Sequence, residues 1–197
     1  MRVLSVLLAM LWAAFAHAEP SLREGDLIFH QSRSSQSLAV QLATGSRYSH
    51  MGMLLRKDGQ LQVFEASATV RYTPLPQWVA RGEGGHYVVK RLHAGIDDAG
   101  LIKLRHEAER FSGARYDLTF EWSDSRLYCS ELVWKAYQRA LGVEIGALQR
   151  VRDFNLAAPA VRAKMRERYG DKVPLDEPVI SPLAMFESPL LFTVGER

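Results

Sequence analysis

The chain contains one cysteine, Cys129, within the stretch YDLTFEWSDSRLYCSELVWKAY. A lone thiol cannot form an internal disulfide, so it is an inert buried group, half of a disulfide to another molecule, or a nucleophile. The apolar residues that follow recur at helical spacing and end at Gly142, which places the thiol in the first turn of a helix. There, free backbone N–H groups and the helix dipole stabilise a thiolate and the oxyanion of an acyl-transfer intermediate. A small buried residue would occupy the same position equally well.

A nucleophilic cysteine needs a base, and a predicted hairpin supplies one. The dipeptide Asp58-Gly59 separates HMGMLLRK from LQVFEAS and is typical of a two-residue β-turn. Counting outward from that turn puts His50 and Glu65 on one face, diagonally adjacent, with Gly52 leaving room beside them. A carboxylate there would fix the tautomer of the imidazole and stabilise the imidazolium. A three-residue loop would shift the register by one residue and separate the two side chains.

Other classes of function receive little support. The net charge is +3 and the basic residues are scattered, so nucleic-acid binding is not indicated. A zinc site is not expected, because the histidines show no ligand spacing around one another or around Cys129; they are His17, His30, His50, His86, His93 and His106. We therefore expect neither a metal nor an organic cofactor.

The chain is long enough for one compact domain and short for two. Its first eighteen residues, MRVLSVLLAMLWAAFAHA, have the basic start, apolar run and small residues of a cleaved secretory signal peptide. A retained anchor is the alternative, although the run is short for a membrane span. We predict a signal peptide at 1–18, a periplasmic or secreted domain at 19–197, and a proline-rich tail at 171–197 laid over that domain.

The pattern along the domain predicts an α+β fold, in which helices pack on an antiparallel sheet. Strands are expected for GDLIFH, HMGMLLRK, LQVFEAS, VRYTPL and YVVKRL. Helices are expected for SSQSLAVQLATG, capped by Ser34 or Ser35, for DDAGLIKLRHEAERFSG, with Leu101, Ile102, Arg105, Ala108 and Phe111 recurring at helical spacing, and for the segment from Cys129.

These motifs together resemble a known family, the permuted papain-like amidases of the YaeF and YiiX type. That family is related to the NlpC cell-wall peptidases and to the lecithin:retinol acyltransferases. The resemblance covers nearly all of the mature chain. It rests on GDLIFH, YSHMGMLL, VFEAS, GARYD, YCSELVWKAY and ISPLAMFESPLL. The histidine strand precedes the cysteine helix here, which is the order of the circularly permuted branch and implies a circularly permuted, NlpC-like papain fold.

The resemblance implies that Cys129 is the nucleophile, His50 the general base and Glu65 the residue that orients it. Tyr116, in GARYD, would donate to the oxyanion, and Tyr128 would line the cleft; core packing explains both tyrosines equally well. The implied function is hydrolysis of an amide in a cell-wall or related peptide. The first alternative is a lipid ester hydrolase or acyltransferase on the same residues, with the membrane only as a source of substrate. The second is a non-catalytic module that binds peptide or lipid.

Overall fold

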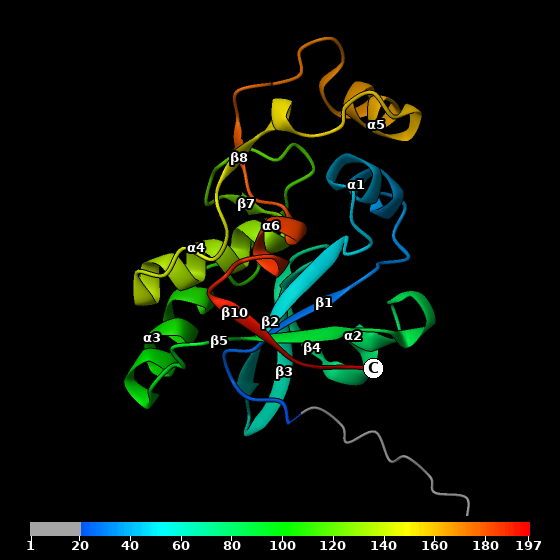
Figure 1. Ribbon diagram of the computed structural model, residues 1–197. Coiled ribbons are helices and arrows are strands. Elements are labelled where there is room, and N and C mark those ends of the chain that lie inside the picture. Colours follow the sequence, from blue (N-terminus) through cyan, green and yellow to red (C-terminus); the bar gives the residue numbers. More distant parts are fainter. Residues whose placement is uncertain (1–20) are drawn as a thin grey trace, which may run out of the picture.

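The computed structural model describes residues 21–197, and the predicted signal peptide at 1–18 lies outside the described residues. Within that range, none of the helices has the length and apolar character needed to cross a membrane. The fold is an antiparallel sheet with helices packed around it (Figure 1). The predicted combination of an antiparallel sheet and packed helices is therefore confirmed.

The main sheet has six strands in the order β10-β5-β1-β2-β3-β4, and every neighbouring pair is antiparallel. The strands are β1 (Leu27–His30), β2 (His50–Lys57), β3 (Gln60–Ala66), β4 (Val70–Pro74), β5 (Val88–Leu92) and β10 (Leu191–Glu196). Two short pairs complete the strands: β6 (Arg115–Tyr116) with β7 (Arg126–Leu127), and β8 (Gln149–Arg150) with β9 (Pro178–Val179).

The hairpin between β2 and β3 has the predicted two-residue turn. Asp58 and Gly59 both adopt positive φ angles, 51° and 79°, as this type of turn requires. Lys57 faces Gln60, and the pairing continues without a break to Met53 opposite Phe64. The predicted register is confirmed. It extends toward His50 on β2 and Glu65 on β3.

Within residues 21–197, six helices accompany the sheet, together with two 3₁₀ turns at Glu83–Gly85 and Val151–Asp153. The helices are α1 (Ser37–Thr44), α2 (Leu75–Val79), α3 (Asp98–Glu109), α4 (Cys129–Leu141), α5 (Pro159–Tyr169) and α6 (Pro182–Phe186). Alternation along the strands divides the core in two. One face of the sheet packs on α3, α4 and α6, and the other packs on α2.

Helix α4 begins at Cys129, as the sequence predicts, and ends at Gly142, which has a left-handed φ of 67°. Helix α1 starts slightly later than expected. Its N-cap is Gln36 rather than Ser34 or Ser35. The Ser37 N–H donates to the carbonyl of Ser34 in a turn before the helix, so these serines belong to the approach loop.

Helix α3 is capped by Asp97, whose side chain accepts a hydrogen bond from the Gly100 N–H at 2.7 Å. Its buried stripe is Gly100, Leu104 and Ala108, spaced four residues apart, and it packs against α4. A Cβ atom at Gly100 would lie 3.2 Å from Leu141 of α4. Ile102, predicted to share the apolar face, is 60% exposed. That part of the prediction is wrong because close helix packing selects the stripe that contains glycine.

The proline-rich tail does more than cover the domain. It supplies β9, α6 and β10, and β10 forms the edge of the main sheet beside β5. In Figure 1 the red strand β10 lies next to β5, and α5 lies beside α1 away from the sheet. Helix α5 was not predicted. It carries many charges, and Val161 is its only residue classed as buried.

Truncation of Leu104 tests the packing of α3 on α4. We expect Leu104→Ala to lower the free energy of unfolding by about 2–5 kcal/mol, because a fully buried leucine leaves a cavity. The matched control is Ile102→Ala on the exposed face of the same helix, which should change it by no more than about 0.5 kcal/mol. Urea unfolding measures both, and equal effects would contradict the observed helix orientation.

Candidate active site

The site lies where the N-terminus of α4 meets the β2–β3 hairpin. Cys129 is the first residue of α4 and is only 4% exposed. Its sulfur accepts hydrogen bonds from the backbone N–H groups of Met51 and Ser130. Helix α4 therefore presents the thiol to the start of β2, with backbone donors on both elements.

His50 joins the thiol to a carboxylate. Its Nε2 lies 2.6 Å from Oε2 of Glu65, and its side chain is also hydrogen-bonded to Cys129. Because Nε2 is occupied by the carboxylate, the hydrogen bond to the thiol falls to Nδ1. The structure thus brings together the three side chains that the sequence singled out.

Glu65 is fully buried and has two partners besides His50. The Thr73 hydroxyl on β4 donates to Oε1 at 2.7 Å. Arg81 follows α2 in the chain, and its guanidinium forms an ion pair with the same oxygen. Every oxygen of the carboxylate is therefore hydrogen-bonded, as a buried charge requires.

The contacts determine the protonation states of the imidazole and the carboxylate. Burial alone would lower the pKa of His50, but its hydrogen bonds to Cys129 and Glu65 outweigh burial and raise that pKa to about 9. Burial alone would raise the pKa of Glu65, but the hydrogen bond and charge of His50, with Thr73 and Arg81, lower it to about 2. At neutral pH the imidazole is protonated and the carboxylate is ionised.

The thiol follows the same logic. Burial alone would raise the pKa of Cys129, yet the hydrogen bond and charge of His50, together with the two backbone donors, lower it. A lowered thiol pKa beside a raised imidazole pKa describes a thiolate–imidazolium pair. This is the charge state in which a cysteine acts as a nucleophile.

Tyr116 stands at the end of a short hydrogen-bond chain. Arg168 on α5 donates through Nη2 to Oε1 of Gln36 at 2.7 Å. An arginine only donates, so the amide group of Gln36 must turn its Nε2 toward Tyr116, and it donates to that hydroxyl at 2.7 Å. The hydroxyl accepts this bond, which leaves its own proton to be donated elsewhere.

Tyr128 has a different position from Tyr116. It is the N-cap residue of α4, and its ring packs edge-on against Phe120. Its hydroxyl accepts a hydrogen bond from the Ile180 N–H at 3.0 Å. Tyr128 lines a cavity, and its hydroxyl holds the C-terminal segment in place.

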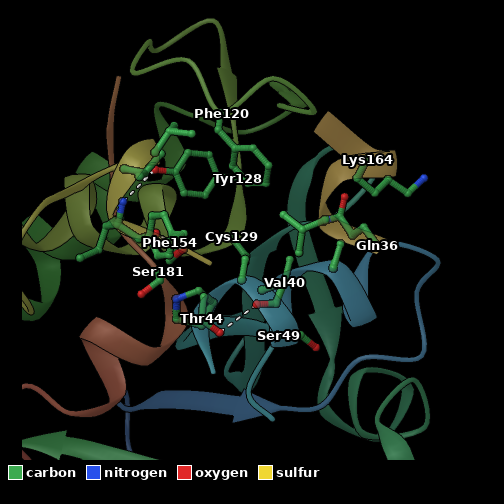
Figure 2. Close-up of a pocket in the computed structure, with 18 of the residues that line it drawn as sticks. Gln36, Val40, Thr44, Ser49, Phe120, Tyr128, Cys129, Phe154, Lys164 and Ser181 are labelled. Atoms are coloured by element: carbon green, nitrogen blue, oxygen red, sulfur yellow. Dashed lines mark hydrogen bonds between the residues drawn. The ribbon is translucent and has the colours of Figure 1, made fainter. Parts of the chain in front are cut away.

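That cavity is apolar and has a volume of about 90 Å³. Figure 2 shows Cys129 among the residues that line it, with Tyr128 and Phe154 on one side and Val40 and Ser49 on the other. Its apolar lining comes from α1, the loop before α4, the 3₁₀ turn at Val151–Asp153 with the residue after it, α5 and the C-terminal segment: Ala39, Val40, Ala43, Phe120, Tyr128, Val151, Phe154, Val161, Met165, Val179, Ile180 and Pro182.

A second, polar cleft of about 450 Å³ lies on the His50 side. It is lined by serines, histidines and arginines from the loops after β1 and α2 and the end of β3. Gln36, Ser49 and Tyr116 line both spaces and form the boundary between them. The boundary places the thiol with the apolar cavity and the imidazole with the polar cleft.

Sequence reasoning missed Arg81, Thr73, Gln36 and Arg168. Thr73 lies on β4, the strand that pairs with β3. Glu65 faces Arg71 in that pairing, so the neighbours of Arg71 on β4 were candidates for contact with Glu65. The other three reach the site through contacts between segments far apart in the chain, for which the sequence offers no local signal. Among residues 21–197 there is no group of three or more His, Cys, Asp or Glu side chains that could hold a metal ion.

Comparisons with known proteins agree with this geometry. The family model described as permuted papain-like amidase enzyme, YaeF/YiiX, C92 family, matches residues 21–195. The uncharacterised protein YiiX of Escherichia coli is 51% identical over 173 residues, which are 88% of this chain and 86% of that protein. A crystal structure of the metalloprotein YiiX from Escherichia coli is 51% identical, with a TM-score of 0.86, and covers 89% of this chain and 97% of that chain.

The thiolate–imidazolium pair predicts an unusual pH dependence for alkylation of Cys129. The thiol pKa is lowered and the imidazole pKa is raised, so a larger fraction of Cys129 is thiolate near neutral pH than for an ordinary thiol. The rate with iodoacetamide should therefore begin to rise at a lower pH than the rate of a model thiol and should exceed that rate near neutral pH. Mass spectrometry of the reduced, folded protein measures this rate.

Replacement of His50 should restore ordinary thiol behaviour. In His50→Gln we expect the alkylation rate to rise with pH around the value of about 8.5 typical of a free thiol. His106→Gln, at an exposed histidine on α3, is the matched control and should keep the wild-type profile. A wild-type profile that rises around pH 8.5 and does not depend on His50 would exclude the ion pair.

Proposed function

The chain belongs to the YaeF/YiiX family of permuted papain-like amidases, and on that premise we propose that it hydrolyses an amide through an acyl-enzyme on Cys129. The observation that carries the proposal is the hydrogen bond between the Cys129 thiol and His50, whose other nitrogen is held by a buried Glu65. A binding module would have no use for a thiolate–imidazolium pair, so this contact favours an enzyme.

The proposed reaction has two steps. The thiolate of Cys129 attacks the amide carbonyl to form a carbon–sulfur bond, His50 gives its proton to the leaving nitrogen, and the carbon–nitrogen bond breaks. Water, deprotonated by His50, then attacks the thioester, and the acid and the free thiolate are released. Glu65 keeps the imidazole oriented and stabilises its positive charge throughout.

Two donors are available for the oxyanion of the tetrahedral intermediate. As the first residue of α4, Cys129 has a backbone N–H with no intrahelical acceptor. The Tyr116 hydroxyl accepts from Gln36 and so retains a proton to donate. Together they form the proposed oxyanion hole.

The two spaces beside Cys129 indicate which part of the substrate lies where. The leaving nitrogen takes its proton from His50, so the amine belongs in the polar cleft that His50 lines. The acyl group, bonded to sulfur, belongs in the apolar cavity that Cys129 lines. We therefore propose an amide between an apolar acyl group and a polar amine.

This substrate class modifies the expectation of a cell-wall peptide. Such a peptide has polar groups on both sides of its amide bonds, whereas the cavity on the Cys129 side is mainly apolar. The apolar cavity equally favours a second candidate, an ester with the same acyl group. The first eighteen residues have the sequence pattern of a signal peptide, which supports the proposal of a periplasmic or secreted enzyme.

No metal enters the proposed reaction. The similar crystal structure is described as that of a metalloprotein. In this chain, residues 21–197 do not bring three potential ligands of the His, Cys, Asp or Glu type together, and the steps above need only the protein's own groups.

Substitution of the site residues tests the reaction with an N-acylated amino acid as substrate. Cys129→Ala should abolish turnover, and Glu65→Gln should leave partial activity because the imidazole stays in place without its charged partner. Tyr116→Phe should lower kcat by about 10²–10³, the loss typical of one oxyanion donor, with KM little changed. Product formation by chromatography measures all three.

The control for Tyr116→Phe is Tyr72→Phe. The Tyr72 hydroxyl donates to Glu109 on α3 and lines neither space beside Cys129, so this variant should retain wild-type kcat. Normal turnover in Cys129→Ala would rule out the acyl-enzyme. An unchanged kcat in Tyr116→Phe would show that Tyr116 does not belong to the oxyanion hole, but it would not contradict the acyl-enzyme.

Acyl-chain length tests the apolar cavity. With one amine and the acetyl, hexanoyl and dodecanoyl groups, kcat/KM should rise from acetyl by about fourfold for each methylene that the cavity buries, until it is full. Val40→Phe narrows the cavity and should reduce the rate for the longer chains far more than for acetyl. Leu38 on α1 is 56% exposed, so Leu38→Phe should leave the rates for all chain lengths unchanged. A kcat/KM that does not depend on chain length would contradict the placement of the acyl group.

A further inference from the structure

The polar cleft beside His50 has a distinctive lining. The residues that contribute to it include five serines, two arginines and two histidines, and none of the described residues that line it is acidic. The serines are Ser32, Ser34, Ser35, Ser49 and Ser67. A cleft lined by hydroxyl and guanidinium donors without a carboxylate is complementary to an anion.

The two arginines are held together by backbone pairing between their loops. The Arg33 N–H donates to the carbonyl of Arg81, and the Arg33 guanidinium donates to the carbonyl of Ala80 at 2.5 Å. A bridge between Ser32 and Gly82 extends this pairing. Each guanidinium has five N–H donors, and the contacts above and the ion pair with Glu65 use only part of them. Both arginines thus retain donors for a ligand.

Two further polar groups of the lining have no hydrogen-bond partner among the described residues: the ring nitrogens of His30 and the hydroxyl of Ser67. His30 is 1% exposed and is stacked on Trp78 at 3.8 Å between ring centroids. Burial, and then the positive charges of His50 and Arg81, lower its pKa to about 3. The imidazole is therefore neutral, as expected beside an excess of positive charge.

We propose that this cleft binds an anionic group, a carboxylate or a phosphate, carried by the leaving amine of the substrate. The inference rests on the proposed function, in which His50 protonates the leaving amine. Since His50 lines the polar cleft, the amine is placed on this side of the site. The substrate would then be an N-acyl amine with an apolar acyl group and an acidic amine portion, as in an N-acyl amino acid. Arg33 and the serines would hold the anion while His50 protonates the nitrogen.

A matched panel of amides tests this proposal with the full-length mature protein. All members carry the hexanoyl group, and the amines are glycine, glycinamide, ethylenediamine and phosphoethanolamine. We expect kcat/KM for hexanoylglycine to exceed that for the neutral hexanoylglycinamide by about tenfold or more, as for a charge-assisted hydrogen bond. The cationic amide should be the poorest substrate. The phosphoethanolamine amide shows whether phosphate or carboxylate is preferred.

The variant Arg33→Gln tests the contribution of the guanidinium. Arg33 is exposed and lies outside the hydrogen bonds of Cys129, His50 and Glu65, so the fold should tolerate the change. The ratio of kcat/KM between hexanoylglycine and hexanoylglycinamide should fall toward one. Arg110, the residue after α3, lines neither space, so Arg110→Gln is the matched control and should keep the wild-type ratio.

The outcomes separate this inference from the function on which it rests. Hydrolysis of the neutral or cationic amide as fast as the anionic one would overturn the anion site and leave the hydrolase intact. A wild-type ratio in Arg33→Gln would also overturn it. Failure to hydrolyse any amide of the panel would contradict the proposed function itself.

Discussion

The structure around the site depends on one buried charge, the carboxylate of Glu65. It is fully inaccessible to water, and a buried carboxylate is stable only when its oxygens are paired and hydrogen-bonded. Its partners come from three places in the fold: His50 on β2, Thr73 on β4 and Arg81 after α2. A shift of one residue in either strand pairing would turn Glu65 to the opposite face of the sheet and separate it from all three. The need to neutralise this carboxylate therefore constrains the register of three strands and the path of the chain after α2.

The same constraint reaches the thiol through His50. With Nε2 held by Glu65, the imidazole ring has one orientation, and its other nitrogen meets α4 at its first residue. The position of α4 depends in turn on the tight contact between Gly100 and Leu141 and on the packing of α4 against β2 and β3. Removal of the carboxylate would leave a buried imidazole without its counter-charge, and the pKa of His50 would fall toward the value that burial alone favours. The protonation state of His50 therefore depends on the strand pairing that brings Glu65 to it.

The parts of this arrangement that could be predicted from the sequence have local signals. The Asp58-Gly59 turn defines a register, and counting residues from it puts His50 and Glu65 on one face, diagonally adjacent. A glycine stop and helical spacing place Cys129 at a helix start. Arg81 and Arg168 could not be predicted, because they reach the site through contacts with residues distant in sequence. Helix α5 has almost no apolar period, since it buries little but Val161, and Ile102 was misplaced because close packing at Gly100 overrides the apolar pattern. The family resemblance indicated the chemistry, but the division into apolar cavity and polar cleft is visible only in the structure.

The two sides of the site act in opposite directions on the pKa of the Cys129 thiol. The apolar cavity disfavours a thiolate, and Cys129 is nearly inaccessible to water. The backbone donors of Met51 and Ser130 and the charge of His50 favour the thiolate from the other side, and their combined effect lowers the thiol pKa. Moving the same thiol into the polar cleft would lower its desolvation cost, but it would also expose the thiolate to water and to oxidants. A boundary made by Gln36, Ser49 and Tyr116 keeps the thiolate on the apolar side while its counter-charge lies on the polar side. The two spaces therefore meet at the hydrogen bond between Cys129 and His50, the proposed nucleophile and proton donor.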